Sequence, residues 1–188
     1  SVLEEIEREV EEIRRRIEKV LKELNDDDRR VIEDSKRLNE KLEKEVRDIE
    51  RKARDLLRKL KDTDDDREMK KILREVEKMV EELKRRSDEV VKRTRRVVDR
   101  LREKNKDVLR RIEKKIRELK DKIEKISAPR EELEKLKRRL DEELDRVREK
   151  VEENIRRTDK AVEDSERENE RLKRELDEKV KRIRDELR

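Results

Sequence analysis

Carboxylates are the commonest side chains here that could do chemistry, since the 188-residue sequence holds 58 aspartates and glutamates. Adjacent pairs such as Glu4 and Glu5 could serve acid–base catalysis, and inward-facing groups could bind metal ions. The helical pattern described below puts almost all of them on solvated faces. It leaves Asp28 as the single carboxylate at an apolar position. We therefore expect neither an enzyme nor a metal site.

Missing residue types exclude further classes of site. The sequence has no histidine, cysteine or glycine, so it lacks imidazole and thiolate ligands, a base near neutral pH, and a glycine-rich phosphate loop. It also has no aromatic residue to stack on bases, although residues 63–128 hold 24 basic against 17 acidic side chains. We expect no cofactor and no nucleic-acid partner.

The apolar residues, 28% of the chain, fall on a lattice with an eighteen-residue repeat. In the last third of the chain it begins with Leu133, Leu136, Leu140, Leu144, Val147 and Val151. One repeat further along lie Val151, Asn154, Thr158, Val162, Ser165 and Asn169, and the next repeat reaches Asn169, Leu172, Leu176, Val180, Ile183 and Leu187. Such a repeat closes in five turns, which matches an α-helix without supercoil.

The lattice breaks twice, around residues 62–64 and 127–129, which predicts three helices over about 2–61, 64–126 and 129–187. Thr63 with Asp66 resembles a capping box, and Ser127 is the expected N-cap before Pro129. Short turns make neighbouring helices antiparallel. The predicted fold is all-α: one domain over 1–188, a long, nearly straight up-down-up bundle with little supercoil.

The segment Asn25–Asp28 could instead be a turn followed by a new helix. The lattice passes through it without a change of phase, whereas a loop would usually reset the phase. We therefore expect a continuous first helix.

Ten polar residues occupy lattice positions near the middle of the three predicted helices, where apolar residues are expected. They are Asp28, Ser35, Asn39, Ser87, Thr94, Asn105, Asn154, Thr158, Ser165 and Asn169. One interpretation puts some of them at the edge of the apolar face, half solvated. The other is a set of buried hydrogen-bond networks, because an unpaired buried polar group costs about 1–3 kcal/mol and so penalises wrong registers.

Aligning the helix midpoints predicts which of these residues meet. Asn39, Ser87 and Ser165 would share one layer. Ser35, Thr94 and Thr158 would form a second, and Asp28 would lie near Asn154.

The lattice, the turns DTDDD and SAP, and surfaces such as EKEVRDIERKARDLLRKL resemble computationally designed, parametrically generated three-helix bundles. The resemblance covers the whole chain, and it implies high stability and no natural activity. Such designs often use glycine in their turns, which this chain lacks. Natural bundles such as spectrin repeats usually carry aromatic core residues, also absent here.

The leading hypothesis is a designed structural protein, monomeric, with no ligand. The alternative is a subunit of a designed homo-oligomer, because the middle segment carries additional apolar residues at Ile72, Met79, Val90, Val97 and Val108. No apolar run approaches the ~20 residues that span a bilayer, so no membrane role is expected. We expect a soluble protein in the cytosol of an expression host.

The predicted helices are each about 90 Å long at ~1.5 Å per residue. Small-angle X-ray scattering should therefore give a maximum dimension near that length. A compact particle near half of it would contradict the rod.

Overall fold

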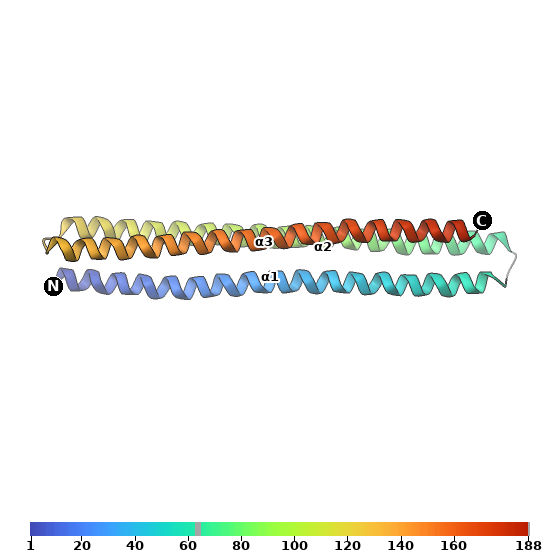
Figure 1. The fold of residues 1–188 in the computed structure, drawn as a ribbon, viewed down its shortest axis with the longest axis horizontal. Coiled ribbons are helices and arrows are strands. Elements are labelled where there is room, and N and C mark those ends of the chain that lie inside the picture. The colour runs from blue at the N-terminus through green and yellow to red at the C-terminus, as the bar shows by residue number, and fades with distance from the viewer. Residues whose placement is uncertain (63–64, 188) are drawn as a thin grey trace. The chain divides into compact units, whose positions relative to one another are not determined.

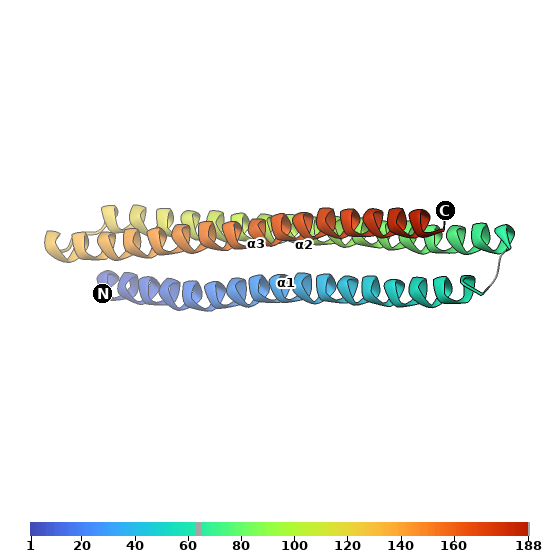
Figure 2. The ribbon, with the colours of Figure 1, turned by 45° about the vertical axis from the view of Figure 1, so that its right-hand side comes forward.

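The structure is a computed structural model that describes residues 1–62 and 65–187. It contains three helices, α1 (Val2–Leu60), α2 (Asp66–Lys125) and α3 (Arg130–Glu186), coloured from blue to red in Figure 1. The described residues form no strand. Chain direction alternates from helix to helix (Figure 2), so the chain is an all-α, up-down-up three-helix bundle, as predicted.

The helix ends lie close to the predicted ones, but the caps differ. Asp65 caps α2, because its Oδ1 accepts a hydrogen bond from the Arg67 amide at 3.0 Å. The predicted cap Thr63 lies outside the described residues. At α3 the residue before the first turn is Pro129, whose carbonyl accepts from the Leu133 amide at 3.2 Å, and the prediction for Ser127 is wrong.

Helix α1 runs without interruption through Asn25–Asp28, which confirms the continuous helix. Three consecutive aspartates have low helix propensity, but tertiary packing overrides propensity of this size. Leu21 and Leu24 before the segment are buried, and so is Asp28 within it. The segment therefore keeps one face of α1 in the core.

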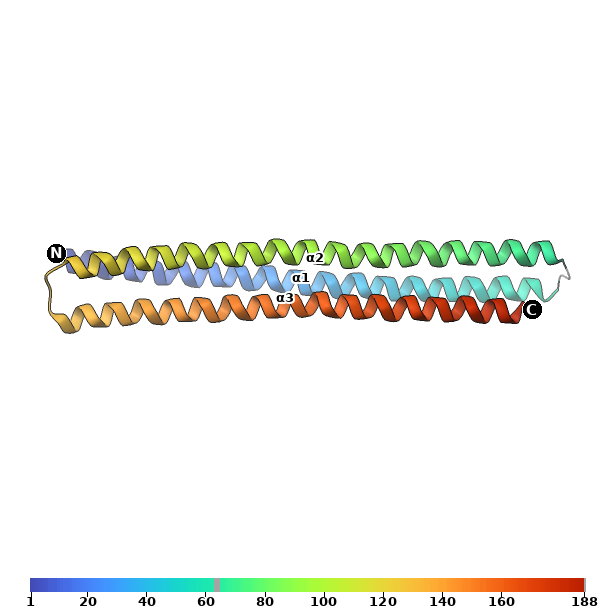
Figure 3. The same ribbon diagram turned by 90° about the horizontal axis from the view of Figure 1, so that it is seen from above.

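The described chain divides into two compact units, and each helix contributes a segment to both. Unit 1 comprises Ser1–Val31 and Val97–Asp159, and unit 2 comprises Ile32–Arg96 and Lys160–Arg188. Within each unit the three segments lie side by side (Figures 1 and 3). The boundaries between the units fall, along each helix, in the part of the sequence that carries the polar lattice residues.

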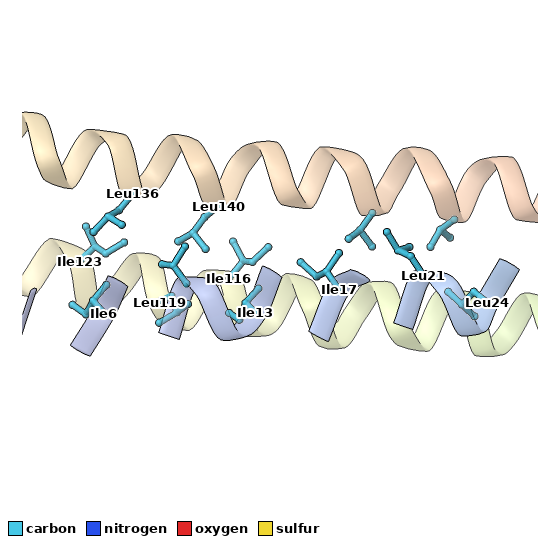
Figure 4. Close-up of a cluster of buried hydrophobic side chains, with 13 residues drawn as sticks. Ile6, Ile13, Ile17, Leu21, Leu24, Ile116, Leu119, Ile123, Leu136 and Leu140 are labelled. Atoms are coloured by element: carbon cyan, nitrogen blue, oxygen red, sulfur yellow. The ribbon is translucent and has the colours of Figure 1, made fainter. Parts of the chain in front are cut away.

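The core of unit 1 is aliphatic and draws on all three helices. In Figure 4, Ile17 of α1, Ile116 of α2 and Leu140 of α3 point into the space between the three helices, and each is at most 1% exposed. Fully burying such a side chain stabilises the folded state by about 1.5–3 kcal/mol. The other members of this cluster are Ile6, Val10, Ile13, Leu21, Leu24, Leu119, Ile123, Leu136, Val147 and Val151.

The core of unit 2 is built in the same way from the other segments. Leu83 of α2 and Leu176 of α3 are fully buried there, and Val46 of α1 is 4% exposed. The other members of this cluster are Leu42, Ala53, Val76, Val80, Leu172, Val180 and Ile183. Every buried member of the two clusters comes from α1, α2 or α3, and Ile126, in the turn after α2, packs half-buried against the cluster of unit 1.

Ion pairs between the helices repeat with the same step as the core. Between α1 and α2 they join Glu9 to Lys122, Asp27 to Lys104 and Glu45 to Arg86, at 3.3, 2.6 and 3.0 Å. Between α2 and α3 they join Glu113 to Arg148, Arg95 to Glu166 and Glu77 to Arg184. Exposed pairs of this kind contribute at most about 1 kcal/mol each, so they report the helix register more than they stabilise it.

Hydropathy separates these helices from membrane spans. Within residues 1–62 and 65–187, no helix is long and apolar enough to cross a membrane.

Candidate functional site

The polar lattice residues are the candidate site, and most of them are withdrawn from solvent. Eight are buried with exposed fractions of 5% or less: Asp28, Ser35, Ser87, Thr94, Asn105, Asn154, Thr158 and Ser165. They are all the buried polar residues of the described chain. Asn39 and Asn169 are half-buried, because they lie at the edge of the apolar face.

In unit 2, Ser87 begins a chain of hydrogen bonds that leads from the core to the surface. The Ser87 hydroxyl donates to Oδ1 of Asn169, whose Nδ2 donates to Oδ1 of Asp88 at 3.0 Å. The same carboxylate oxygen pairs with the ammonium of Lys173 at 2.5 Å. The Lys173 ammonium, and then the Asn169 amide, lower the pKa of Asp88, which keeps this end of the chain ionised and accepting.

The α3 partner of Ser87 is thus Asn169, one helical turn beyond the predicted Ser165. The prediction aligned helix midpoints, whereas the register follows from the link between α2 and α3. Pairing residues outward from the helix ends Lys125 and Arg130 sets Ser87 opposite residue 168. Ser165 is 1% exposed, and its hydroxyl oxygen has no hydrogen-bond partner among the described residues.

In unit 1, two asparagines meet between α2 and α3. Nδ2 of Asn154 donates to Oδ1 of Asn105 at 3.4 Å, a long bond between side chains that are each 1% exposed. Nδ2 of Asn105 in turn donates to the Leu101 carbonyl at 2.8 Å. Oδ1 of Asn154 has no partner among the described residues, so this pair is only partly satisfied.

The two buried threonines bond to their own helices. The Thr94 hydroxyl donates to the Val90 carbonyl at 2.9 Å, and the Thr158 hydroxyl donates to the Asn154 carbonyl at 3.0 Å. Hydroxyls commonly satisfy themselves in this way within helices. Neither bond joins two helices, and Thr94 belongs to unit 2 and Thr158 to unit 1, so their predicted layer with Ser35 stays a prediction.

Asp28 is the least compensated polar residue of unit 1. Its side chain is 2% exposed, and neither carboxylate oxygen has a hydrogen-bond partner among the described residues. The cation that acts on it is Arg157, which pairs with Glu153 at 2.7 Å. Asp28 shares unit 1 with Asn154, its predicted neighbour, but neither carboxylate oxygen is bonded to that amide.

The environment of Asp28 favours the neutral acid. The pKa of its carboxyl is raised to about 7, mainly by burial; Arg157 opposes the rise, and the negative charges of Asp27 and Glu153 add to it. An ionised carboxylate without hydrogen bonds is costly in a core, so the proton is retained in the folded state at mildly acidic pH.

Chemically, the arrangement offers amides, hydroxyls and one carboxyl, with no activated nucleophile beside a base. Across the described residues there is no group of three or more carboxylates that could hold a metal ion. Asp88 and Lys173 complete the chain of bonds in unit 2, and neither was predicted to belong to the site. The sequence feature that could have identified them is the repeat of oppositely charged residues on the facing sides of α2 and α3. Glu124 and Lys137 form the equivalent ion pair in unit 1, two lattice repeats away.

The chain has a structural likeness to solved proteins but no match among family models or curated proteins. It is similar to a solved structure described as "Computationally designed three helix bundle", at 21% sequence identity and a TM-score of 0.49. The match covers 99% of this chain and 86% of that one. A likeness at this level carries no information about activity.

The raised pKa of Asp28 makes stability depend on pH in a defined direction. Because the folded carboxyl holds its proton more tightly than the unfolded one, its contribution to stability is complete below about pH 4 and is lost as pH rises to about 7. Asp28→Asn should remove this loss. Urea unfolding should show the variant more stable than the parent by about 2–4 kcal/mol above neutral pH, with little difference near pH 4.

Asp26→Asn is the control for this prediction, because Asp26 is exposed and its charge is not among those that shift the pKa of Asp28. It should give no gain above neutral pH. An unchanged dependence of stability on pH in Asp28→Asn would show that this carboxyl titrates normally.

Proposed function

We propose that this chain is a designed structural protein, a helical bundle without enzymatic activity, whose buried polar residues specify the pairing of its helices. The observation that carries the proposal is the set of hydrogen bonds between α2 and α3. Ser87 with Asn169 and Asn105 with Asn154 are polar pairs at positions where the lattice predicts apolar residues.

The need for such pairs follows from the lattice itself. Because the apolar positions are periodic, a shift of one helix by a full repeat again sets apolar residues opposite apolar residues. A shifted arrangement loses core only at the ends. It also separates each buried polar group from its partner, at about 1–3 kcal/mol per unpaired group. The polar pairs thus supply the specificity that a repeating core cannot supply.

A designed origin is supported by the strictness of the repeat. The eighteen-residue repeat is found in the core positions, in the ion pairs between α1 and α2, and in the ion pairs between α2 and α3. Surface charges that contribute little to stability are under weak constraint, so a repeat that extends to them indicates a sequence generated by rule. Charged residues make up 64% of the sequence, and aromatic residues are absent, which fits such a surface and core.

Single and paired replacements test the role of the asparagines. Asn105→Leu should destabilise the protein by about 1–3 kcal/mol, because both polar atoms of the Asn154 amide would then be buried without partners. The double variant Asn105→Leu with Asn154→Leu should recover that loss or exceed the parent in stability. Chemical denaturation measures both. A double variant that loses the sum of two single losses would contradict the pairing.

Register can be read separately, because the chain has no cysteine of its own. Arg102 pairs with Asp159, so Arg102→Cys with Asp159→Cys reports the native register by disulfide formation. Arg102→Cys with Asp141→Cys reports a shift by one full repeat. The shifted disulfide should form more readily when Asn105 and Asn154 are both leucine. Equal yields in both backgrounds would remove the specificity role.

The second candidate function is a subunit of a homo-oligomer, for which the additional apolar residues of α2 were the reason. Their exposure favours the monomer. Val2, at 56%, is the one exposed large apolar residue in the described chain, and Ile72, Val90 and Val108 are half-buried. A stable interface buries about 800 Å² on each partner, which these side chains do not offer.

We therefore expect a monomer. Multi-angle light scattering should give the mass of one chain, 23.4 kDa, over a wide range of protein concentration. A mass of two or three chains at low concentration would favour the oligomer instead.

A further inference from the structure

A hollow with an apolar floor lies between α1 and α2 in unit 1. It has a volume of about 460 Å³. Its apolar lining consists of Ile13, Ile17, Val20, Val108 and Ile112. Ile13 and Ile17 belong to the buried core shown in Figure 4, whereas Val20, Val108 and Ile112 are half-buried and face the hollow. The floor is thus a narrow aliphatic slot that lies over the core.

The hollow is part of a longer groove along the same pair of helices. A hollow of about 130 Å³ shares Ile13 and Arg16 with it and extends to Glu9 and Lys122. On the other side, a hollow of about 510 Å³ shares Val20 and Val108 and extends toward Leu24. The groove therefore follows α1 from Glu9 to Leu24, which corresponds to a length of about 22 Å at ~1.5 Å per residue.

The rim of the central hollow is strongly cationic. Arg16, Arg111, Lys114 and Lys115 line it, against the single carboxylate of Glu118. All four cations are exposed, and within the described chain none of them forms an ion pair. This differs from the two flanking hollows, where the lining cations Lys122 and Lys104 form ion pairs, with Glu9 and Asp27 respectively. Unneutralised positive charge is thus concentrated at the middle of the apolar slot.

We propose that this groove binds an anionic amphiphile with a single alkyl chain, such as a long-chain carboxylate. The alkyl chain lies along the slot formed by Val20, Val108 and Ile112, and the anionic headgroup lies among Arg16, Arg111 and Lys115. The volume falls within the range of small-molecule sites, and the combination of apolar floor and convergent charge is the usual basis of their affinity. No covalent step is involved.

A second copy of the chain fits the groove less well. A docked helix is about 10 Å wide with its side chains and needs an apolar stripe of matching width. The groove exposes only parts of three aliphatic side chains, and its cations would face their own images across a two-fold axis. The narrow slot and the excess of positive charge both favour a thin, anionic ligand.

Isothermal titration with dodecanoate, above neutral pH and below its critical micelle concentration, tests the proposal. We expect saturable binding of one dodecanoate per chain. Dodecyltrimethylammonium, which has the same alkyl chain and a cationic headgroup, should bind at least about fivefold more weakly, since its charge is repelled by the rim. Absence of saturable binding, or equal binding of the two amphiphiles, would overturn the proposal.

Matched variants locate the site. Arg111→Glu should weaken dodecanoate binding about three- to tenfold by reversing one rim charge. Arg93→Glu changes the net charge by the same amount on the same helix, one lattice repeat away in unit 2, and should change binding less than about twofold. Val108→Gln tests the apolar slot in the same way and should weaken dodecanoate binding. Its control is Val90→Gln, one lattice repeat away in unit 2, which should not, although both valines are half-buried.

Three results would contradict this location. They are equal effects of Arg111→Glu and Arg93→Glu, equal effects of the two valine variants, and a dimer by light scattering that dissociates when dodecanoate is added. Circular dichroism of each variant checks that the helices are intact, so that a loss of binding reports the groove.

Discussion

The constancy of helical phase is the constraint on which the rest of this structure depends. Because the lattice returns to the same angle after every repeat, each of the three helices keeps one face inward along its length with little need to supercoil. Leu3 and Leu57 lie near opposite ends of α1, and both are partly buried against apolar clusters. A period that drifted would have carried one of them to the solvent. The ion pairs between the helices repeat with the same period, because the charged residues that form them lie beside the buried apolar face of each helix.

A periodic core also has a disadvantage, since it does not distinguish between registers that differ by one repeat. In the function proposed above, the buried polar residues break this equivalence, and they differ in how well their polar groups are compensated. Ser87 reaches the surface through Asn169 and Asp88, so its polarity is compensated by a chain that ends on an ion pair. Asn105 and Asn154 compensate each other only in part, because Oδ1 of Asn154 is left without a partner among the described residues. Buried polar groups that are only partly compensated reduce stability, and the specificity gained from them is the part that the asparagine variants test.

Asp28 and Ser165 are among the buried polar residues whose burial costs the most stability. Both are buried, and their side-chain oxygens have no partner in the part of the chain that the structure describes. For Asp28 the cost is moderated by protonation, since its raised pKa allows a neutral carboxyl below about pH 7. Serine has no such option, but it is small and neutral, so its unpaired hydroxyl costs less. The two residues show that occupying a lattice position does not by itself provide a partner.

From the order of the residues we could predict the three helices, the continuity of α1 through Asn25–Asp28, and the lattice positions at which eight polar residues are buried. These properties depend on periodicity along one chain, which is fully present in the order of the residues. The hydrogen-bond partners of the polar residues could not be predicted in this way. Asn169 rather than Ser165 bonds to Ser87, because the register between α2 and α3 depends on where the helices end at Lys125 and Arg130. A shift of one turn changes every partner without changing any lattice position. Side-chain positions in the folded protein decide whether a threonine bonds across the core or to its own helix. They also decide whether a cation such as Arg111 is paired, and the periodicity of the chain does not specify either.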